Sequence, residues 1–275
     1  MLSFIEQKLS EFRSCFSRTA TYNWFIIMIT GLMVRFDSLG VTSFIRALSL
    51  DHRFYESLLH FFRSNAFSTE KLKLRWRKIV FRHAPFIRLN GRILILGDGT
   101  KVSKEARHMP GVKKLCQESE DSSKPQFIHG HMFGGIGAVI GNDSNSFCIP
   151  LDLNIQDGLR ETASWGNGNL SDAASHVVQM IRNAHEASQT FGEDSYCVLD
   201  RYFLTVPALI ELSTLNGASA HRLDIITRAK NNCIAFEEPD LIRFLAVDVH
   251  VKRGLPLNSI SFSMTGLMIS KKQRP

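Results

Sequence analysis

Apolar residues in roughly the first 80 positions recur with the spacing of helices. Phe4, Ile5 and Leu9 follow this pattern near the start of the chain, which would align them on one helix face. Further along, residues 42–48 and 51–63 predict two short helices with a tight break, and Asp51 fits the N-cap of the second. Such a pair is compatible with a helix-turn-helix-like unit, but a plain helical bundle gives the same pattern and is the favoured interpretation.

Two more helices are predicted in this region from their composition. Residues 68–82 are rich in Lys and Arg and predict a basic helix. The most apolar run, 25–34, is interrupted by Thr30 and Gly31, and it is shorter than the ~20 apolar residues that a membrane-spanning helix needs. We therefore expect a buried helix there, with no membrane segment and no signal peptide.

From Pro85 onward the apolar pattern becomes that of strands. Residues 92–96 form a short apolar run that ends at Gly97-Asp98-Gly99, so a buried strand would deliver Asp98 at its carboxyl end. Two longer runs, 127–140 and 146–155, flank an Asn-Asp-Ser-Asn sequence and predict a hairpin.

The pattern alternates between helices and strands after the hairpin. Residues 171–190 predict an amphipathic helix that stops at Gly192, and residues 196–199 predict a buried strand that ends at Asp200. A helix over 206–215 and a strand over 223–228 follow. This order predicts an α/β fold with a mixed sheet and flanking helices, behind an all-helical N-terminal region.

The positive charge of the chain is concentrated in one segment. The 275 residues carry a formal net charge of +7. Residues 68–115 hold thirteen Lys and Arg against three acids, whereas residues 116–196 hold eleven acids against three Lys and Arg. Such a basic segment fits contact with a phosphate backbone, although two solvated helix faces would give the same count.

Five cysteines are scattered through the sequence without a Cys-x-x-Cys pair. An odd, dispersed set argues against a disulfide framework and against a zinc site. We therefore expect reduced thiols and a cytoplasmic protein. The closely spaced His129 and His131 are interpreted as packing or hydrogen-bonding groups rather than metal ligands.

The candidate chemistry depends on Asp98 and Asp200. Each follows an apolar strand, and functional residues of α/β sheets gather beyond the carboxyl ends of strands. Two neighbouring carboxylates suit hard cations such as Mg²⁺, and two such ions ~3.5–4 Å apart can assist phosphoryl transfer. A phosphatase of the haloacid dehalogenase class is excluded, because its nucleophilic Asp would stand at Leu96.

Three blocks of this sequence resemble the catalytic region of bacterial insertion-sequence transposases, which have an RNase H-like fold. The first block contains GDGTK, HMPGVKK and SKPQFIHGH within residues 97–131. The second is VLDRYF at 198–203, and the third is IITRAK at 225–230. Together the blocks cover most of the region from about 90 to 235.

The resemblance implies a DDE-type DNA transposase. In that family a triad of carboxylates binds two Mg²⁺ ions, or Mn²⁺ in their place. The DNA is hydrolysed at transposon ends, and the freed 3′-hydroxyl then attacks target DNA. Asp98 and Asp200 would be the two catalytic, metal-ligating aspartates, DNA would be the partner, and a homo-oligomer is compatible with this class. The basic side chains beside the proposed metal site are expected to contact DNA. A solvated loop is the alternative for those that follow Asp98, and an ion pair with an acid is the alternative for the one that follows Asp200. These side chains are Lys101, Lys104, Arg107, Lys113, Lys114 and Arg201.

The sequence departs from the family at the third carboxylate. The family's Glu lies on a helix well after the second Asp, whereas Glu237 and Glu238 come shortly after the last predicted strand. Residues 253–275 show little periodicity, so we expect an irregular tail that reads as a truncated or frameshifted end. The expected core domain, 86–252, would then lack its final helix, behind a helical region over 1–85.

Four functional interpretations follow from these expectations. A transposase, or a remnant of one, would bind DNA but cleave it poorly because one ligand is missing. A catalytically inactive protein could instead occupy transposon ends, or pair with a full-length partner, and inhibit transposition. An unrelated RNase H-like nuclease would need further acids and would prefer junctions or hybrids. An inert, unstable product is the fourth interpretation, since a missing final helix would expose apolar surface.

Overall fold

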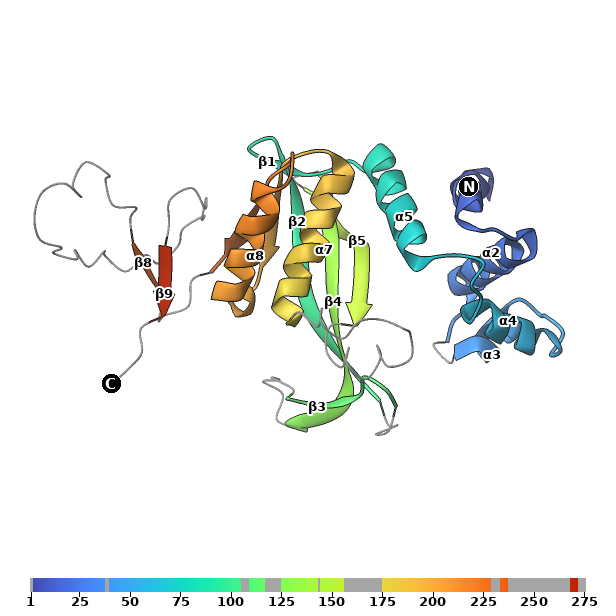
Figure 1. Ribbon diagram of the computed structural model, residues 1–275. Helices are drawn as coiled ribbons and strands as arrows, with labels where there is room; N and C mark the ends of the chain where they lie inside the picture. The colour runs from blue at the N-terminus through green and yellow to red at the C-terminus, as the bar shows by residue number, and fades with distance from the viewer. Residues whose placement is uncertain are drawn as a thin grey trace, which may run out of the picture. The chain divides into compact units, whose positions relative to one another are not determined.

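The computed structural model describes residues 2–37, 40–104, 109–116, 125–142, 144–155, 175–228, 233–236 and 268–271. The chain divides into two compact units, Met1–His83 and Ala84–Pro275. Each unit has its own element types, shown in Figure 1, and each is considered by itself.

The first unit is helical in its described residues, as its apolar spacing predicts. An aromatic cluster forms its core, in which Phe16 and Phe61 are 4% exposed and Phe25 is 6% exposed. Phe16 and Phe25 lie with their ring centroids 5.1 Å apart, a separation typical of favourable aromatic pairs. The helices are α1 (Leu2–Ser10), α2 (Thr19–Val34), α3 (Gly40–Ala47), α4 (Phe54–Phe62) and α5 (Thr69–His83), with a short 3-10 helix η1 (Arg13–Cys15).

Two expectations for this unit are corrected by the structure. Helix α2 is not a buried helix, because Leu32, Met33 and Val34 at its end are 42%, 58% and 43% exposed. It is apolar around much of its circumference, and a small helical unit covers only part of that surface. Asp51 is not the N-cap of α4, which begins at Phe54. The N-cap position is Arg53, whose backbone N donates to the Asp51 carboxylate at 2.9 Å.

The second unit is mixed α/β and is built on a mixed sheet. Strand β4 (Phe127–Gly141) pairs antiparallel with β2 (Arg92–Ser103) on one edge. Its other edge pairs with β3 (Lys113–Cys116) and then with β5 (Ser146–Ile155). On the far side of β2, the strands β6 (Ser195–Leu199) and β7 (Leu223–Thr227) run parallel to it. A short β1 (Arg88–Leu89) also pairs with β2.

Helices cover one face of this sheet. Helix α7 (His176–Phe191) connects β5 to β6, and α8 (Val206–Gly217) connects β6 to β7; both lie in front of the sheet in Figure 1. Alternate residues of β2 point toward them, so Ile93 and Ile95 are fully buried. Gly192 ends α7 as predicted, with a positive φ of 68°, which glycine adopts without steric cost.

The observed strands differ from the predicted ones in two places. Strand β2 does not stop after Leu96 but continues to Ser103, because its antiparallel pairing with β4 persists over the polar half. Strand β3 was not expected at all. Within the expected irregular tail, β9 (Met268–Lys271) pairs antiparallel with β8 (Cys233–Phe236). None of the helices in the described residues combines the length and apolarity needed to cross a membrane.

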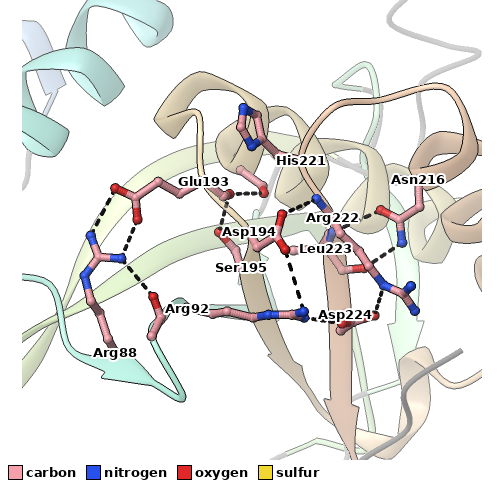
Figure 2. A network of polar contacts seen from close by, with 12 residues as sticks. Arg88, Arg92, Glu193, Asp194, Ser195, Asn216, His221, Arg222, Leu223 and Asp224 are labelled. Carbon is pink, nitrogen blue, oxygen red and sulfur yellow. Dashed lines mark hydrogen bonds and ion pairs between the residues drawn. The ribbon is translucent and has the colours of Figure 1, made fainter. Parts of the chain in front are cut away.

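Charged side chains tie together the amino ends of the three parallel strands (Figure 2). The buried Asp224 of β7 accepts hydrogen bonds from Arg92 of β2 and from Arg222 Nε, the latter at 2.8 Å. Arg92 Nη2 also lies 3.6 Å from Asp194 Oδ2, immediately before β6. Since the network joins all three strands, it fixes the end of the sheet opposite to Asp98.

Candidate functional site

Asp98 and Asp200 lie side by side where the parallel pairing of β2 and β6 ends. The last paired residues are Gly97 and Leu199, so the two aspartates occupy the next position on each strand. Neighbouring strands lie about 5 Å apart, and this spacing sets the separation of the two Cα atoms. Asp98 is inside β2 rather than at its end, because β2 continues opposite β4, with Asp98 facing Gly135.

Both aspartates lie on the sheet face opposite to the helices. A Cβ on Gly97 would meet Leu199 Cδ2 at 2.5 Å and Met180 Sδ at 3.2 Å, so Gly97 and Leu199 face α7. Successive side chains of a strand point to opposite faces. Asp200 keeps an extended backbone, with φ −65° and ψ 154°, so it continues the alternation of β6, as Asp98 continues that of β2.

The immediate surroundings of the two carboxylates are open and contain few donors. Both residues are exposed. Asp98 Oδ1 accepts a hydrogen bond from Gly99 N at 2.7 Å, and Asp200 Oδ1 accepts one from Arg201 N at 2.6 Å. In the part of the chain that the structure describes, neither carboxylate forms an ion pair with a cationic side chain. Their remaining oxygen lone pairs are therefore available to a cation or to water.

Arg228 extends this row and was not singled out as a site residue from the sequence. Thr227 pairs with Leu199 at the end of β7, so Arg228 directly follows in line with Asp98 and Asp200. Its side chain is exposed, as is that of Arg201. The signal for Arg228 was its position after a third parallel strand, which becomes informative only when the register is known. The row therefore presents two carboxylates and two arginines.

The basic residues after Asp98 divide between the two faces of the sheet. Lys101 is three residues beyond Asp98 in the same strand, so alternation directs it to the opposite face. Lys104 follows β2, and its N donates to His129 O at 2.8 Å. It therefore continues the alternation onto the Asp98 face. Lys101 Nζ instead donates to Cys116 O at 2.6 Å.

The two lysines of β3 lie farther from the aspartates than the sequence suggested. Lys113 pairs with Gly130 and Lys114 with His129 on β4, whereas Asp98 faces Gly135. Five residues along a strand span about 17 Å. The structure thus separates these lysines from the carboxylates along the sheet. Arg107, the remaining predicted DNA contact, lies outside the described residues.

His131 has a structural role that fits its interpretation as a hydrogen-bonding group. It is 5% exposed, and its Nε2 lies 3.0 Å from Pro110 O. This contact holds the turn at 109–112 against β4. The described ranges of the chain contain no cluster of three or more potential metal ligands.

The same observation bears on the missing third carboxylate. Among the residues that the structure describes, Asp98 and Asp200 have no third Asp, Glu, His or Cys grouped with them. Glu237 and Glu238, the candidates from the sequence, lie outside the described residues. The site as described therefore offers two protein oxygen ligands, fewer than a pair of divalent ions takes from a full set of three carboxylates.

No protein-family model matches this chain, and no curated protein matches it either. The class of the second unit therefore follows from its architecture alone: a mixed α/β unit with two adjacent aspartates at the carboxyl ends of parallel strands.

Proposed function

We propose that the second unit is an RNase H-like domain of the DDE transposase class that binds DNA and holds divalent ions with Asp98 and Asp200. The observation that carries the proposal is the adjacency of the two aspartates on one face of the β2–β6 pair. They are 102 positions apart in the sequence, and the parallel register alone brings them together. Adjacent exposed carboxylates repel each other, and a bound cation would offset that repulsion.

The order of elements supports the RNase H-like assignment. The chain runs through a strand with an aspartate, a hairpin, a helix, a second strand with an aspartate, a helix and a third strand. This is the order in the sequence blocks that resemble the transposases. Helices α7 and α8 lie on the face away from the aspartates, and both carboxylates are exposed, as contact with a bulky substrate such as duplex DNA requires.

The residues present fit Mg²⁺ in part. Two carboxylates supply the hard oxygen ligands that Mg²⁺ prefers, and the rest of its coordination would come from water and substrate phosphates. When bound, the ions supply Lewis-acid stabilisation of the attacking and leaving oxygens. Arg201 and Arg228, both exposed beside Asp200, would position phosphate groups by charge-assisted hydrogen bonds. Since the described residues group no third carboxylate with these two, we propose that the chain binds DNA but cleaves it poorly.

The metal proposal is tested by titrating the full chain with Mn²⁺ and following free Mn²⁺ by electron paramagnetic resonance. We expect Asp98→Asn and Asp200→Asn each to weaken Mn²⁺ binding by about tenfold or more, because each removes one of two charged ligands. Glu6→Gln, at an exposed carboxylate in the first unit, is the matched control and should bind like the unaltered chain. Unchanged Mn²⁺ affinity in both aspartate variants would contradict the assignment of the metal site to Asp98 and Asp200.

A second candidate function is a catalytically inactive DNA-binding inhibitor, and the absence of a third ligand among the described residues favours it. Both candidates predict DNA affinity that falls steeply with salt. They differ in nicking of supercoiled plasmid with Mg²⁺. A transposase remnant gives weak nicking that Asp98→Asn abolishes, whereas an inhibitor gives none, with DNA binding intact in both proteins. Affinity that is insensitive to salt would contradict both.

A further inference from the structure

Strands β2, β4 and β3 continue past the two aspartates as a ribbon with basic side chains on both of its faces. Lys104 N donates to His129 O at 2.8 Å, and Lys114 pairs with His129 across β3 and β4. Asp98 faces Gly135, six residues from His129 on β4, so alternation puts the His129 side chain on the carboxylate face. Lys104, His129 and Lys114 therefore form one row across three strands on that face, which we call the basic row.

The lysines of the basic row are more available to a ligand than the lysines on the other face of the ribbon. Lys104 and Lys114 are exposed, and neither ammonium forms an ion pair within the described part of the chain. Lys114 Nζ lies 4.5 Å from the ring centroid of Phe127, which shares the carboxylate face by the same alternation. On the other face, Lys101 Nζ donates to a backbone carbonyl of β3 at 2.6 Å, and Lys113 is half-buried.

We infer that the basic row is a second phosphate-binding surface for duplex DNA, separate from the two aspartates. This inference rests on the proposed function and adds to it a surface that binds DNA without divalent ions. Lys104 follows Asp98 by six positions, a distance of about 20 Å along a strand, which equals about six base pairs of duplex. Ammonium groups bind phosphates by releasing condensed counterions, whatever the base sequence. The row therefore holds the duplex on the carboxylate face even when the ions are absent.

The turn at 109–112 lies between the basic row and the aspartates, because Pro110 O contacts His131 on the same face. A duplex that touches both surfaces would place this turn in one of its grooves. The major groove is about 12 Å wide and admits an element as large as a helix. The turn is therefore compatible with a duplex that spans both surfaces.

The inference is tested by fluorescence anisotropy with a labelled duplex longer than two helical turns, in EDTA, over a range of salt concentrations. The double variant Lys104→Gln/Lys114→Gln should bind the duplex at least about tenfold more weakly. The slope of log affinity against log salt should fall by about two, since each lost phosphate contact removes about 0.9. The double variant Lys101→Gln/Lys113→Gln removes the same charge from the other face and should keep the slope and affinity of the unaltered chain.

The outcomes separate this inference from the proposed function. If Lys101→Gln/Lys113→Gln lowers the slope as much as the other variant, net charge governs binding and the basic row is wrong. If neither variant lowers the slope of a salt-dependent affinity, the row is wrong while DNA binding stands. If the unaltered chain shows no salt-dependent binding, the proposed function fails and the row with it.

A second measurement on the unaltered chain decides the matter should Lys104→Gln/Lys114→Gln fail to fold. Lysines are acetylated with and without bound duplex, and the modified positions are identified by mass spectrometry. Protection of Lys104 and Lys114 by the duplex, with Lys101 unprotected, supports the basic row. Any other pattern of protection overturns it.

Discussion

The two ends of the parallel strands β2, β6 and β7 are built in opposite ways. At the amino ends, Asp224 is enclosed by Arg92 and Arg222, and the Asp194 carboxylate accepts a hydrogen bond from Arg222 N (Figure 2). At the carboxyl ends, Asp98 and Asp200 are adjacent and exposed, and within the described part of the chain each accepts only the backbone hydrogen bond of the next residue. Carboxylates and guanidinium groups pair at the amino ends, whereas two carboxylates lie side by side at the carboxyl ends without an ion pair among the described residues.

This contrast separates stability from function within one sheet. Pairing every charge at the amino ends fixes the strand register, since the arginines and carboxylates come from three strands and the turns before them. The carboxyl ends continue that register through strand pairing, and the carboxylates of Asp98 and Asp200 are not part of it. Like-charged carboxylates can then be held together in a place where they do not stabilise the fold, as is typical of sites that bind cations or react.

The largest expected effect comes from breaking the amino end. Asp224→Ala should lower the free energy of unfolding by about 2–4 kcal/mol, because it leaves two guanidinium groups without their buried acceptor. The carboxylate is 4% exposed, whereas both arginine side chains reach solvent and can be partly rehydrated, which places the effect below that of a fully buried pair. Urea unfolding followed by circular dichroism measures it.

Asp98→Ala is the matched control, since it makes the same substitution at the other end of the sheet. It should change the free energy of unfolding by no more than about 0.5 kcal/mol, because an exposed carboxylate without a cationic partner contributes little. If both variants lost the same free energy of unfolding, the amino and carboxyl ends of the strands would not differ in their contribution to stability.

A smaller effect is expected from Gly97, the residue that precedes Asp98. Gly97→Ala should cost about 1–2 kcal/mol, because the added methyl group would meet Leu199 and Met180 side chains at 2.5 and 3.2 Å and overpack the interface with α7. The same variant should weaken Mn²⁺ binding, since the backbone that carries Asp98 must shift. Thermal and urea unfolding give the first quantity and the Mn²⁺ titration gives the second.

Gly217→Ala serves as the comparison, because its methyl group would meet nothing within 4 Å at the end of α8. That substitution should be neutral or slightly stabilising. If Gly97→Ala matches it in stability and in Mn²⁺ affinity, the carboxylate end does not depend on how closely the sheet approaches the helix.

The sequence predicted the elements that carry an apolar signal and missed those that depend on pairing. The strands before Asp98 and Asp200 are apolar runs, so their type and order could be predicted from periodicity. The polar half of β2 and the short, basic β3 have no such signal, because long-range pairing with β4 forms them. The lysines after Asp98 were therefore expected beside the aspartates, although Lys101 lies on β2 and Lys113 and Lys114 lie on β3.

The sequence did not predict the charge network at the amino ends of the strands, for the same reason. Arg92 and Asp224 are separated by 132 positions, and no local pattern connects an arginine at a strand start with an aspartate at another. Their meeting depends on the parallel register of β2, β6 and β7. The same register brings Arg228 into line with Asp200, so both findings required the tertiary structure.

The smallest predicted effect is a pH dependence near the amino ends of the parallel strands, where Gln189 links His185 to the turn before β7. His185 of α7 is 5% exposed, and Gln189 Nε2 lies 3.3 Å from its Nε2 while donating to His221 O at 2.6 Å. Burial lowers the pKa of His185, and Glu186 opposes this in part. The folded state therefore holds this imidazole neutral where the unfolded state begins to protonate it. Below the usual histidine pKa of about 6.5, the unfolded chain binds a proton that the folded chain excludes, so stability falls as the pH is lowered.

His185→Gln should remove this contribution and flatten the dependence of unfolding free energy on pH between about 6.5 and 5, above the range in which carboxylates dominate. The difference in slope is at most about 1.4 kcal/mol per pH unit, the limit for one proton. His52→Gln, at a fully exposed side chain of the first unit, should keep the slope of the unaltered chain. A slope that His185→Gln leaves unchanged would mean that the imidazole is protonated within the fold. The amino ends of the parallel strands would then accommodate an additional positive charge. The pairing of charges there would no longer distinguish them from the carboxyl ends.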